Sequence, residues 1–519
     1  MQQEWKPRHS PWLIAMGVML ATFMEVLDTS IANIALPHIA GSLSATPEEA
    51  TWVLTSYLVA NAIVLPTTGW LANHFGRKRV FITCIVLFTL ASALCGLAWS
   101  LPTLICARIL QGVGGGAMVP IAQSIMLESF PRQKRGAAMA IFAQGVVVAP
   151  ILGPTLGGWI TDSYSWRWIF YINLPVGILA VLAAQWLVED PPYIRRNKSA
   201  TIDFIGFGLL AVWLATLQIL LDKGQEADWF GAVWVRWFTL VSILSFAGFV
   251  WWQFKAEHPL VDLRVFKYRN FTIGLILMTT LGAILYGTTA QIPLFLQTLM
   301  GYPALQAGYA MSPRGIAAFF TTFFVGRIVG KVRMRWMLCV GFILLATSSF
   351  MLSNLNLQVA QINVIWPSVV NGIAISFIFV PLTTATMSQL AQQQLGNATG
   401  LYNLMRNLGG SIGIAFVTTM LARGAQAHQA LMVGHLAPDN PAFRQQLAAA
   451  NKLLAHHADP VTASRQAYNA VYSLLDQQAH LWAFVDNFFI FGALALVTMP
   501  LIFLFKRVTA PAKTVETVH

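Results

Sequence analysis

The amino-acid sequence predicts an all-α membrane protein with fourteen transmembrane helices, and three observations support this prediction. Of the 519 residues, 56% are hydrophobic and only 10% are charged, whereas soluble domains carry about 25% charged residues. The apolar residues form runs of about 20, the length that a helix needs to cross a bilayer. The net charge of +12 is divided among short clusters between these runs. Membrane topology explains such clusters better than nucleic-acid binding does.

The apolar runs, taken in order, lie at 12–36, 51–72, 80–99, 102–125, 137–160, 167–188, 202–222, 232–253, 270–299, 305–326, 336–354, 362–390, 398–421 and 482–505. Each suffices for a helix that rises about 1.5 Å per residue through a core of about 30 Å. The first run follows Lys6 and Arg8 as in a signal peptide, but it continues for a full span without a convincing cleavage site. We therefore expect a retained first helix.

Two segments mark helix ends at the membrane surface. GWLANHFGRKR at 69–79 follows the second run and indicates a tight turn on Gly76 beside a cationic cluster. WRWIFYINLPVG at 166–177 opens the sixth run with an aromatic belt, which is typical of a membrane interface.

The fifth run is rich in glycine and proline, with GVVVAPILGPTLGG at 145–158. Pro150 and Pro154 each remove a backbone donor and bend the helix. Gly153 and Gly157 are four residues apart and allow another helix to approach closely. We expect tight helix packing along this run.

The basic residues orient the chain. Loops on one side hold 22 of the 32 Lys and Arg, and loops on the other side hold seven. Because Lys and Arg concentrate in cytoplasmic loops, both termini are expected in the cytoplasm. The remaining three, Arg108, Arg314 and Arg406, lie inside spans, where each either packs against helices and snorkels or serves the function.

Two carboxylates lie in the middle of the first span. Glu25 and Asp28 are three residues apart, so they project from one face of a helix. An ionised acid at this depth costs about 2.5–3.5 kcal/mol, so it is expected to face the protein interior as a titratable site. Arg108 lies at a similar depth in the fourth span and can reach Asp28.

The one long extramembrane segment, 422–481, is expected on the outer side. Asn440-Pro441 and Asp459-Pro460 are capping residues followed by proline, and each predicts the start of a helix. Five of the ten histidines lie in this segment, namely His428, His435, His456, His457 and His480. Their spacing does not suit a metal site, so no metal or cofactor is expected and a docking surface or a plain structured loop is favoured.

Together these motifs resemble the major facilitator superfamily, and within it the fourteen-helix drug:proton antiporter family. The resemblance covers nearly the whole chain. It is carried by LDTSIANIALP at 27–37, Arg108, Gln111 and Gly112, GPTLGG at 153–158, WRWIFYINLPVG at 166–177, and LYNLMRNLGGSIG at 401–413.

The resemblance implies a major facilitator fold with helices arranged as 6+2+6 and alternating access to a central site. The expected domains are an N-terminal six-helix bundle at 1–195, two inserted helices at 196–258, and a C-terminal six-helix bundle at 259–519 with the outer loop 422–481. Similar exporters work with a periplasmic adaptor and an outer-membrane channel, and the outer loop would dock that adaptor.

The resemblance also assigns roles to residues. It implies that Asp28 is the proton-coupling acid and that Arg108 supports proton relay. Glu25 either shares the proton and favours cationic drugs, or is a protonated acid that bonds to a neighbouring helix. The family usually has an acid where this chain has Asn73, so an inner ion pair from that position is not expected.

Polar and aromatic residues expected to line the substrate cavity are Glu25, Asn33, Tyr57, Asn61, Gln123, Tyr286, Gln291, Asn371, Phe377 and Asn403. Residues expected to control gating are Gly76, Arg77, Arg79, Gly153, Pro154, Gly157, Gly158 and Arg406. For each of these, ordinary helix packing is the alternative reading.

The expected function is therefore proton-coupled export of hydrophobic drug-like compounds across the inner membrane. A proton-coupled importer of a sugar or organic solute shares the fold and the acid, but the GPTLGG segment favours antiport. A membrane-embedded enzyme would need clustered ligands at membrane depth, and the spans contain no histidine. A channel is a weaker alternative.

Overall fold

The computed structural model describes residues 7–131, 134–191, 203–257, 259–329, 331–437, 439–455 and 459–506. Within these ranges the chain forms α-helices and short 3-10 turns, without a β-strand. Eleven helices, or twelve if a bent pair is counted as one span, are long and apolar enough to cross a membrane. The other two expected spans, at 51–72 and 305–326, are also helical. The predicted all-α membrane fold is confirmed.

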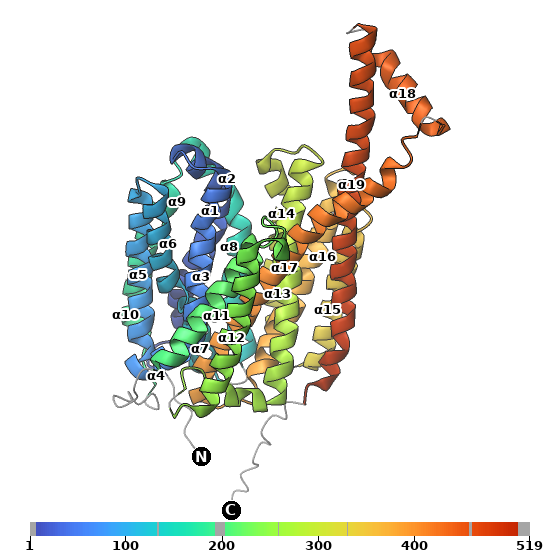
Figure 1. Ribbon diagram of the computed structural model, residues 1–519. Coiled ribbons are helices and arrows are strands. Elements are labelled where there is room, and N and C mark those ends of the chain that lie inside the picture. The colour runs from blue at the N-terminus through green and yellow to red at the C-terminus, as the bar shows by residue number, and fades with distance from the viewer. Residues whose placement is uncertain are drawn as a thin grey trace, which may run out of the picture.

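The N-terminal bundle (Figure 1) consists of α1 (Pro11–Ser42), the short α2 (Pro47–Ala50), α3 (Trp52–Val64), η1 (Leu65–Thr67), α4 (Thr68–Phe75), α5 (Arg77–Leu97), α6 (Leu101–Gly115), α7 (Met118–Ser129), α8 (Arg135–Ser163), α9 (Trp168–Tyr171) and α10 (Asn173–Leu187). The predicted turn on Gly76 is present: this residue has φ of 90°, a conformation that favours glycine. The fourth span is broken after Gly115 into α6 and α7, within a run of three glycines at 114–116.

The C-terminal bundle consists of α13 (Arg269–Thr298), α14 (Ala304–Ile328), α15 (Met334–Leu352), α16 (Ile362–Met387), α17 (Leu395–Val433), α18 (Pro441–Leu454) and α19 (Pro460–Thr498), with short turns η4 (Leu263–Lys267), η5 (Gln392–Gln394) and η6 (Met499–Leu504). The start of α1 and the last described turn, η6, lie at one end of the molecule, here called the termini end (Figure 1). The opposite end carries α18 and is here called the α18 end.

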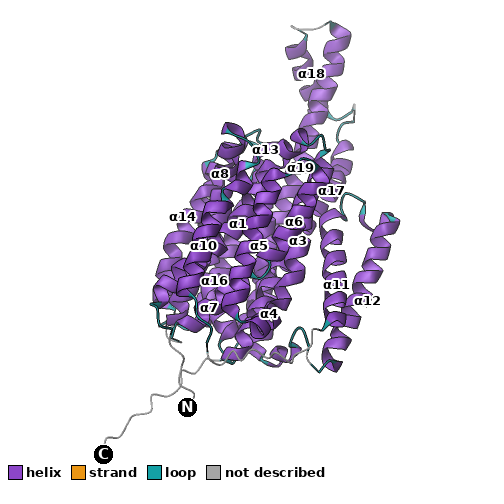
Figure 2. Ribbon diagram, turned by 90° about the vertical axis from the view of Figure 1, so that its left-hand side faces the viewer, coloured by secondary structure: helices purple, strands orange, loops and turns teal. Residues whose placement is uncertain are grey.

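The inserted helices α11 (Phe204–Lys223) and α12 (Val233–Lys255), joined through η3 (Trp229–Gly231), stand as a pair at one side of the molecule (Figure 2). Helix α11 bonds to both bundles. The Thr55 hydroxyl of α3 donates to Asp222, and the Gln218 amide donates to the Ser411 hydroxyl of α17 at 2.8 Å. The insertion therefore bridges the two bundles.

The outer segment 422–481 is less of a loop than the sequence predicts. Helix α17 continues to Val433, and α19 begins at Pro460 and runs unbroken into the last span. The predicted helix starts are confirmed, since Asn440 caps α18 and Asp459 caps α19. Hydrogen bonds from Thr462 hold the pKa of Asp459 below its ordinary value. An apolar run in the sequence therefore indicates which residues span the membrane, but the helix that contains them can continue beyond it.

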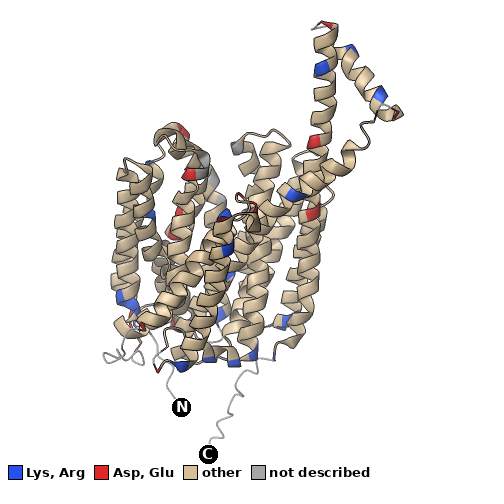
Figure 3. Cartoon of the chain, in the orientation of Figure 1, with Lys and Arg blue, Asp and Glu red and all other residues tan. Residues whose placement is uncertain are grey.

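Basic side chains gather at the termini end, as Figure 3 shows. Large apolar side chains are exposed along the outer faces of the bundle, for example Trp186 at 73% and Phe254 at 74%. Exposed apolar surface on this scale fits a surrounding bilayer.

The two bundles meet near the termini end. A Cβ atom on Gly69 of α4 would lie 2.6 Å from backbone atoms of Asn397 in α17. A Cβ atom on Gly136 of α8 would likewise strike Val329, which caps α14. The amide of Asn403 donates to Gln123 at 2.6 Å, from α17 to α7. Glycine at positions 69 and 136 therefore lets the two bundles approach each other closely.

Candidate functional site

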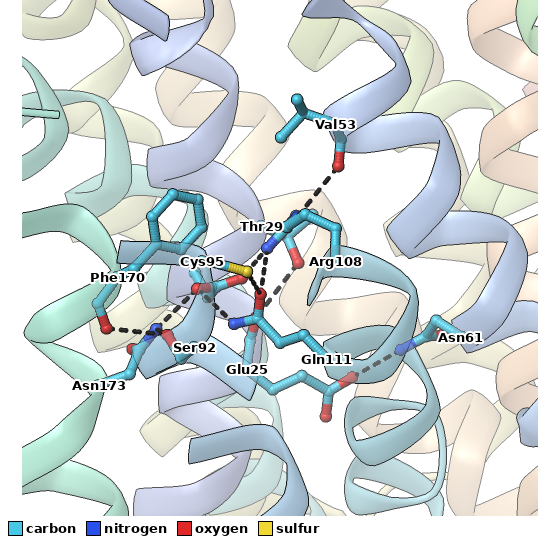
Figure 4. Close-up of polar contacts among 11 residues, drawn as sticks. Glu25, Thr29, Val53, Asn61, Ser92, Cys95, Arg108, Gln111, Phe170 and Asn173 are labelled. Carbon is cyan, nitrogen blue, oxygen red and sulfur yellow. Dashed lines mark hydrogen bonds and ion pairs between the residues drawn. The ribbon is translucent and has the colours of Figure 1, made fainter. Parts of the chain in front are cut away.

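The candidate site is built around Asp28, which is 2% exposed and lies in the middle of α1. Three side chains from two other helices donate hydrogen bonds to its carboxylate (Figure 4). Arg108 Nη1 lies 2.7 Å from Oδ2, Gln111 Nε2 lies 2.9 Å from Oδ1, and Asn173 Nδ2 lies 2.6 Å from Oδ1. The predicted meeting of Asp28 and Arg108 therefore occurs in the structure.

The Arg108 guanidinium is held in place from several directions. Its Nε donates to the Val53 carbonyl at 3.0 Å, and its Nη1 also donates to Gln111 Oε1 at 2.7 Å. The Tyr57 ring covers the guanidinium, with 4.3 Å from Cζ to the ring centroid. A cation over an aromatic face is stabilised by the ring quadrupole. The arginine is thus fixed as the counter-ion of Asp28.

The surroundings of the Asp28 carboxylate match the hydrogen-bonding needs of an ionised group. All three neighbours present N–H donors, and a protonated carboxyl group would instead need an acceptor. Charge-assisted hydrogen bonds of this kind are about twice as strong as neutral ones. Binding a proton at Asp28 therefore requires at least one of these donors to move.

Glu25 lies one turn below Asp28 but occupies a separate environment. The Asn61 amide of α3 donates to its Oε1 at 3.1 Å, while its Oε2 is buried without a hydrogen-bond partner. The guanidinium of Arg406, on α17, lies within electrostatic range of this carboxylate. Glu25 thus faces the second bundle, in contrast to Asp28, which is enclosed by the first.

The other residues predicted to line the cavity differ in their exposure to solvent. Tyr57, Asn61, Gln123, Asn371 and Asn403 are buried, and Tyr286 and Phe377 are half-buried. The Gln123–Asn403 bond brings two of them together across the bundles.

Two predicted residues have other surroundings. Gln291 donates to the Phe484 carbonyl of α19 at 2.8 Å, so its amide group packs within the C-terminal bundle. Asn33 is exposed on the α18-end half of α1.

Among the predicted gating residues, Arg77 forms a buried ion pair with Glu128 at the end of α7. Asn73 and Arg79 are exposed. Asn73 is not an acid and so cannot form an ion pair here. The structure has instead an ion pair between Arg77 and Glu128, which lies on another helix. It ties α5 to α7 at the termini end.

The glycine-rich fifth span packs against α1. A Cβ atom on Gly153 would strike the Ser30 hydroxyl, and one on Gly157 would lie 3.1 Å from Ile31. Gly158 has open space beside it, so it does not belong to this contact. The side chain of Pro154 lies outside the described residues. Arg406 is buried within α17, away from the helix ends, and within electrostatic range of Glu25 of the other bundle.

Four residues of the site were not predicted as site residues, and one of them, Gln111, was named only as part of the fourth-helix motif. Asn173 and Ser92 bond to each other at 3.0 Å, and Glu128 pairs with Arg77. Asn173 lies within the aromatic segment 166–177, where a single amide among apolar residues was the available signal. Glu128 lies just beyond the fourth apolar run and was hidden by the limit of that run.

Comparisons with known proteins agree with this geometry. Residues 18–414 match the model of the Major Facilitator Superfamily. The chain is 36% identical over 498 residues to the fatty acid resistance protein FarB of Neisseria gonorrhoeae, covering 95% of this chain and 96% of that protein. It is 38% identical over 448 residues to the multidrug export protein EmrB of Escherichia coli K12, covering 85% and 86%. The solved proton:xylose symporter XylE matches with a TM-score of 0.60 at 14% identity over 96% of each chain, which shows the fold alone.

Proposed function

The chain belongs to the major facilitator superfamily, as a transporter for drug efflux, and on that premise we propose that it is a proton-coupled antiporter. It exports hydrophobic drug-like compounds across the inner membrane, with its termini in the cytoplasm. The clustering of Lys and Arg at the termini end supports this orientation. The observation that carries the proposal is the buried Asp28 carboxylate, to which three N–H donors of two other helices bond.

The proposed cycle uses Asp28 as the proton site. A proton from outside binds Asp28, which weakens its pairing with Arg108 and releases the donors of Gln111 and Asn173. Because Asp28 lies on α1 and Asn173 on α10, this release loosens the packing between those two helices. The bundles then rock, the proton leaves to the cytoplasm, and a new substrate enters. Binding of substrate and proton in alternation makes the protein an exchanger.

The structure fits the outward-facing state of this cycle. The two bundles close on each other through Gly69, Gly136 and the Gln123–Asn403 bond, all near the proposed cytoplasmic end. An ionised Asp28 is the form that awaits a proton from outside. The moving bodies would be the bundles at 1–195 and 259–519, with 196–258 as the insertion between them. The boundary at 195 lies outside the described residues.

A periplasmic adaptor and an outer-membrane channel are the proposed partners. Helix α19 continues beyond the other helices at the α18 end, and α18 packs beside it there (Figure 1). Such a projection can present a docking surface clear of the bilayer. Deleting 425–478 would spare substrate binding but reduce resistance in a cell with two membranes.

The test is proton release from purified protein on substrate addition, compared with Asp28→Asn. Substrate is expected to release protons from the parent protein and not from the variant. Equal release by both would remove Asp28 from the coupling step. In everted vesicles, an imposed proton gradient is expected to drive substrate accumulation, whereas an importer would show substrate leaving under the same gradient.

A further inference from the structure

Two arginines that are buried within the C-terminal bundle have guanidinium N–H donors without a hydrogen-bond partner. Arg314 of α14 and Arg406 of α17 are each 5% exposed. Arg314 Nη1 donates to the Thr289 hydroxyl at 2.8 Å, but its Nη2 is buried without a hydrogen-bond partner. Nε and Nη1 of Arg406 are also buried without partners. Unpaired buried guanidinium groups are costly, so they require an explanation.

Helices α13 to α17 contain no carboxylate with which to pair them, and the acids of α19, Asp476 and Asp486, pair with histidines. No Asp or Glu occurs between Asp262 and Asp439, a stretch that contains α13 to α17. The N-terminal bundle behaves differently, because its buried arginines each have an acid: Arg77 has Glu128 and Arg108 has Asp28. Two arginines without a local counter-charge therefore distinguish the second bundle.

Glu25 provides only part of the missing charge. Its carboxylate lies within electrostatic range of Arg406, but the side chain that donates a hydrogen bond to it is Asn61 of its own bundle. One carboxylate can balance at most one of the two guanidinium groups. At least one positive charge is therefore left for a ligand.

The two arginines lie at different depths beside the same helix, α13. Arg406 follows Asn403 by three residues on α17, so it shares the face that bonds to Gln123 of the other bundle. Its backbone lies beside Gly282 of α13, while Arg314 bonds to Thr289 of the same helix. These α13 positions are seven residues apart, or about 10 Å along the helix. Arg314 is the nearer of the two to the α18 end.

We propose that Arg406 and Arg314 form an anion-binding path, and that the substrates of this transporter include amphiphilic carboxylates. The carboxylate head takes the place of the missing counter-ion, first at Arg406 and then at Arg314 on the way to the α18 end. Guanidinium groups match carboxylates in geometry and bind them through paired hydrogen bonds. The anion must carry an apolar body, because it has to reach sites enclosed by apolar helices. This inference rests on the proposed export function and specifies its substrate class.

Equilibrium binding to the purified full-length chain in nanodiscs of neutral phosphatidylcholine tests this inference. Three probes share one alkyl chain: decanoate is anionic, decanol is neutral and decyltrimethylammonium is cationic. Tryptophan fluorescence follows binding to the parent chain and to Arg406→Gln, Arg314→Gln and Arg406→Lys. Each Gln variant is expected to bind decanoate about tenfold more weakly, as loss of a charged hydrogen bond implies. The Lys variant should recover part of the loss, and binding of the other two probes should change less than twofold.

Arg423→Gln is the matched control, because Arg423 lies on the same helix as Arg406 but pairs with Asp228 at an exposed site. It should bind all three probes like the parent. Equal loss of all probes in the Gln variants, or unchanged decanoate binding, would overturn the inference. If Arg406→Gln does not fold, Arg314→Gln and Arg406→Lys still decide it. Because these measurements need no proton gradient, they are independent of whether transport proves to be proton-coupled.

Discussion

Asp28 shows at the scale of single residues how the chain stabilises a charge within the membrane. Its carboxylate accepts from a guanidinium and two amides, and the guanidinium in turn is held by the Val53 carbonyl and covered by the Tyr57 ring. A buried pair of this kind is tolerated only when further hydrogen bonds satisfy its remaining atoms. A proton bound at Asp28 would compete with these bonds, because all three neighbours donate N–H groups to the carboxylate.

Asn173 is expected to act as a positioning residue for proton coupling. Its amide joins Asp28 at 2.6 Å to the Ser92 hydroxyl at 3.0 Å, and so links α1, α10 and α5. Asn173→Ala removes a charged hydrogen bond, which is worth about 1.5–3 kcal/mol, and should reduce gradient-driven efflux about tenfold or more. Substrate-induced proton release and efflux should be measured together. Ser92→Ala, which spares the bond to Asp28, should have a smaller effect; an equal effect would indicate a structural role for both.

Glu128 is expected to contribute stability through its buried pair with Arg77. Removing one partner of a buried ion pair costs about 3–5 kcal/mol. Glu128→Gln should therefore lower the thermal unfolding temperature of the purified protein clearly. Arg79→Gln changes an exposed residue two positions from Arg77 and should leave that temperature nearly unchanged. An unchanged Glu128→Gln variant would show that the pair is not important for stability.

The sequence predicted the charged centre better than the polar residues around it. A carboxylate within an apolar span has few explanations, so Asp28 and its partner Arg108 followed from depth alone. Asn173 and Ser92 could not be found in this way, because an amide or hydroxyl in a membrane helix most often serves packing. Arg77 was predicted, but its partner Glu128 depends on how α5 and α7 meet, which no local pattern encodes.

Helix α8 shows at the scale of elements how a proline bend is stabilised. Pro154 has no backbone N–H, so the carbonyl of Pro150 lacks its usual partner one turn later. The Ser30 hydroxyl of α1 donates to that carbonyl at 3.1 Å. Helix α8 bends by 40° between its segments Arg135–Pro150 and Thr155–Ser163. Close approach of α1 is therefore needed both for packing and to satisfy the backbone of α8.

Gly153 is expected to be required for this approach, and Gly158 provides a matched control in the same helix. A Cβ atom on Gly153 would strike the Ser30 hydroxyl, while nothing lies within 4 Å of one on Gly158. Overpacking of this kind costs about 1–3 kcal/mol. Gly153→Ala should lower both thermal stability and efflux, and Gly158→Ala should change neither. Equal behaviour of the two variants would show that the α1–α8 contact tolerates the extra methyl group.

At the scale of the whole molecule, α11 joins bundles that must move relative to each other. Asp222 and Gln218 bond to α3 and α17 respectively, and the Trp229 indole donates to Thr419 of α17 at 3.0 Å. The sequence predicted this helix as a span, yet its place between the bundles depends on contacts that are distant in the chain. If the bundles rock relative to each other, either some of these hydrogen bonds break or α11 moves together with one bundle.

Closure at the termini end should depend on Gly69. Glycine there lets α4 lie directly against the backbone of α17, and a Cβ atom would lie 2.6 Å from the Cα and N atoms of Asn397. Backbone atoms cannot rotate away as a side chain can, so Gly69→Ala should force the bundles apart at this end. A destabilisation of about 1.4 kcal/mol would change the ratio of the two states tenfold. The predicted shift is therefore towards a state that is open at the termini end.

Spin labels at Asn73 and Gln393 can measure this shift, because both side chains are exposed at the termini end and lie on opposite bundles. With the four native cysteines replaced by alanine, the distance distribution of Gly69→Ala should gain a longer component. Gly41→Ala, where nothing lies within 4 Å of the added methyl group, should match the parent. If Gly69→Ala folds and keeps the parent distribution, the Gly69–Asn397 contact does not hold the termini end closed. The outward-facing assignment would then have to rest on the remaining contacts alone.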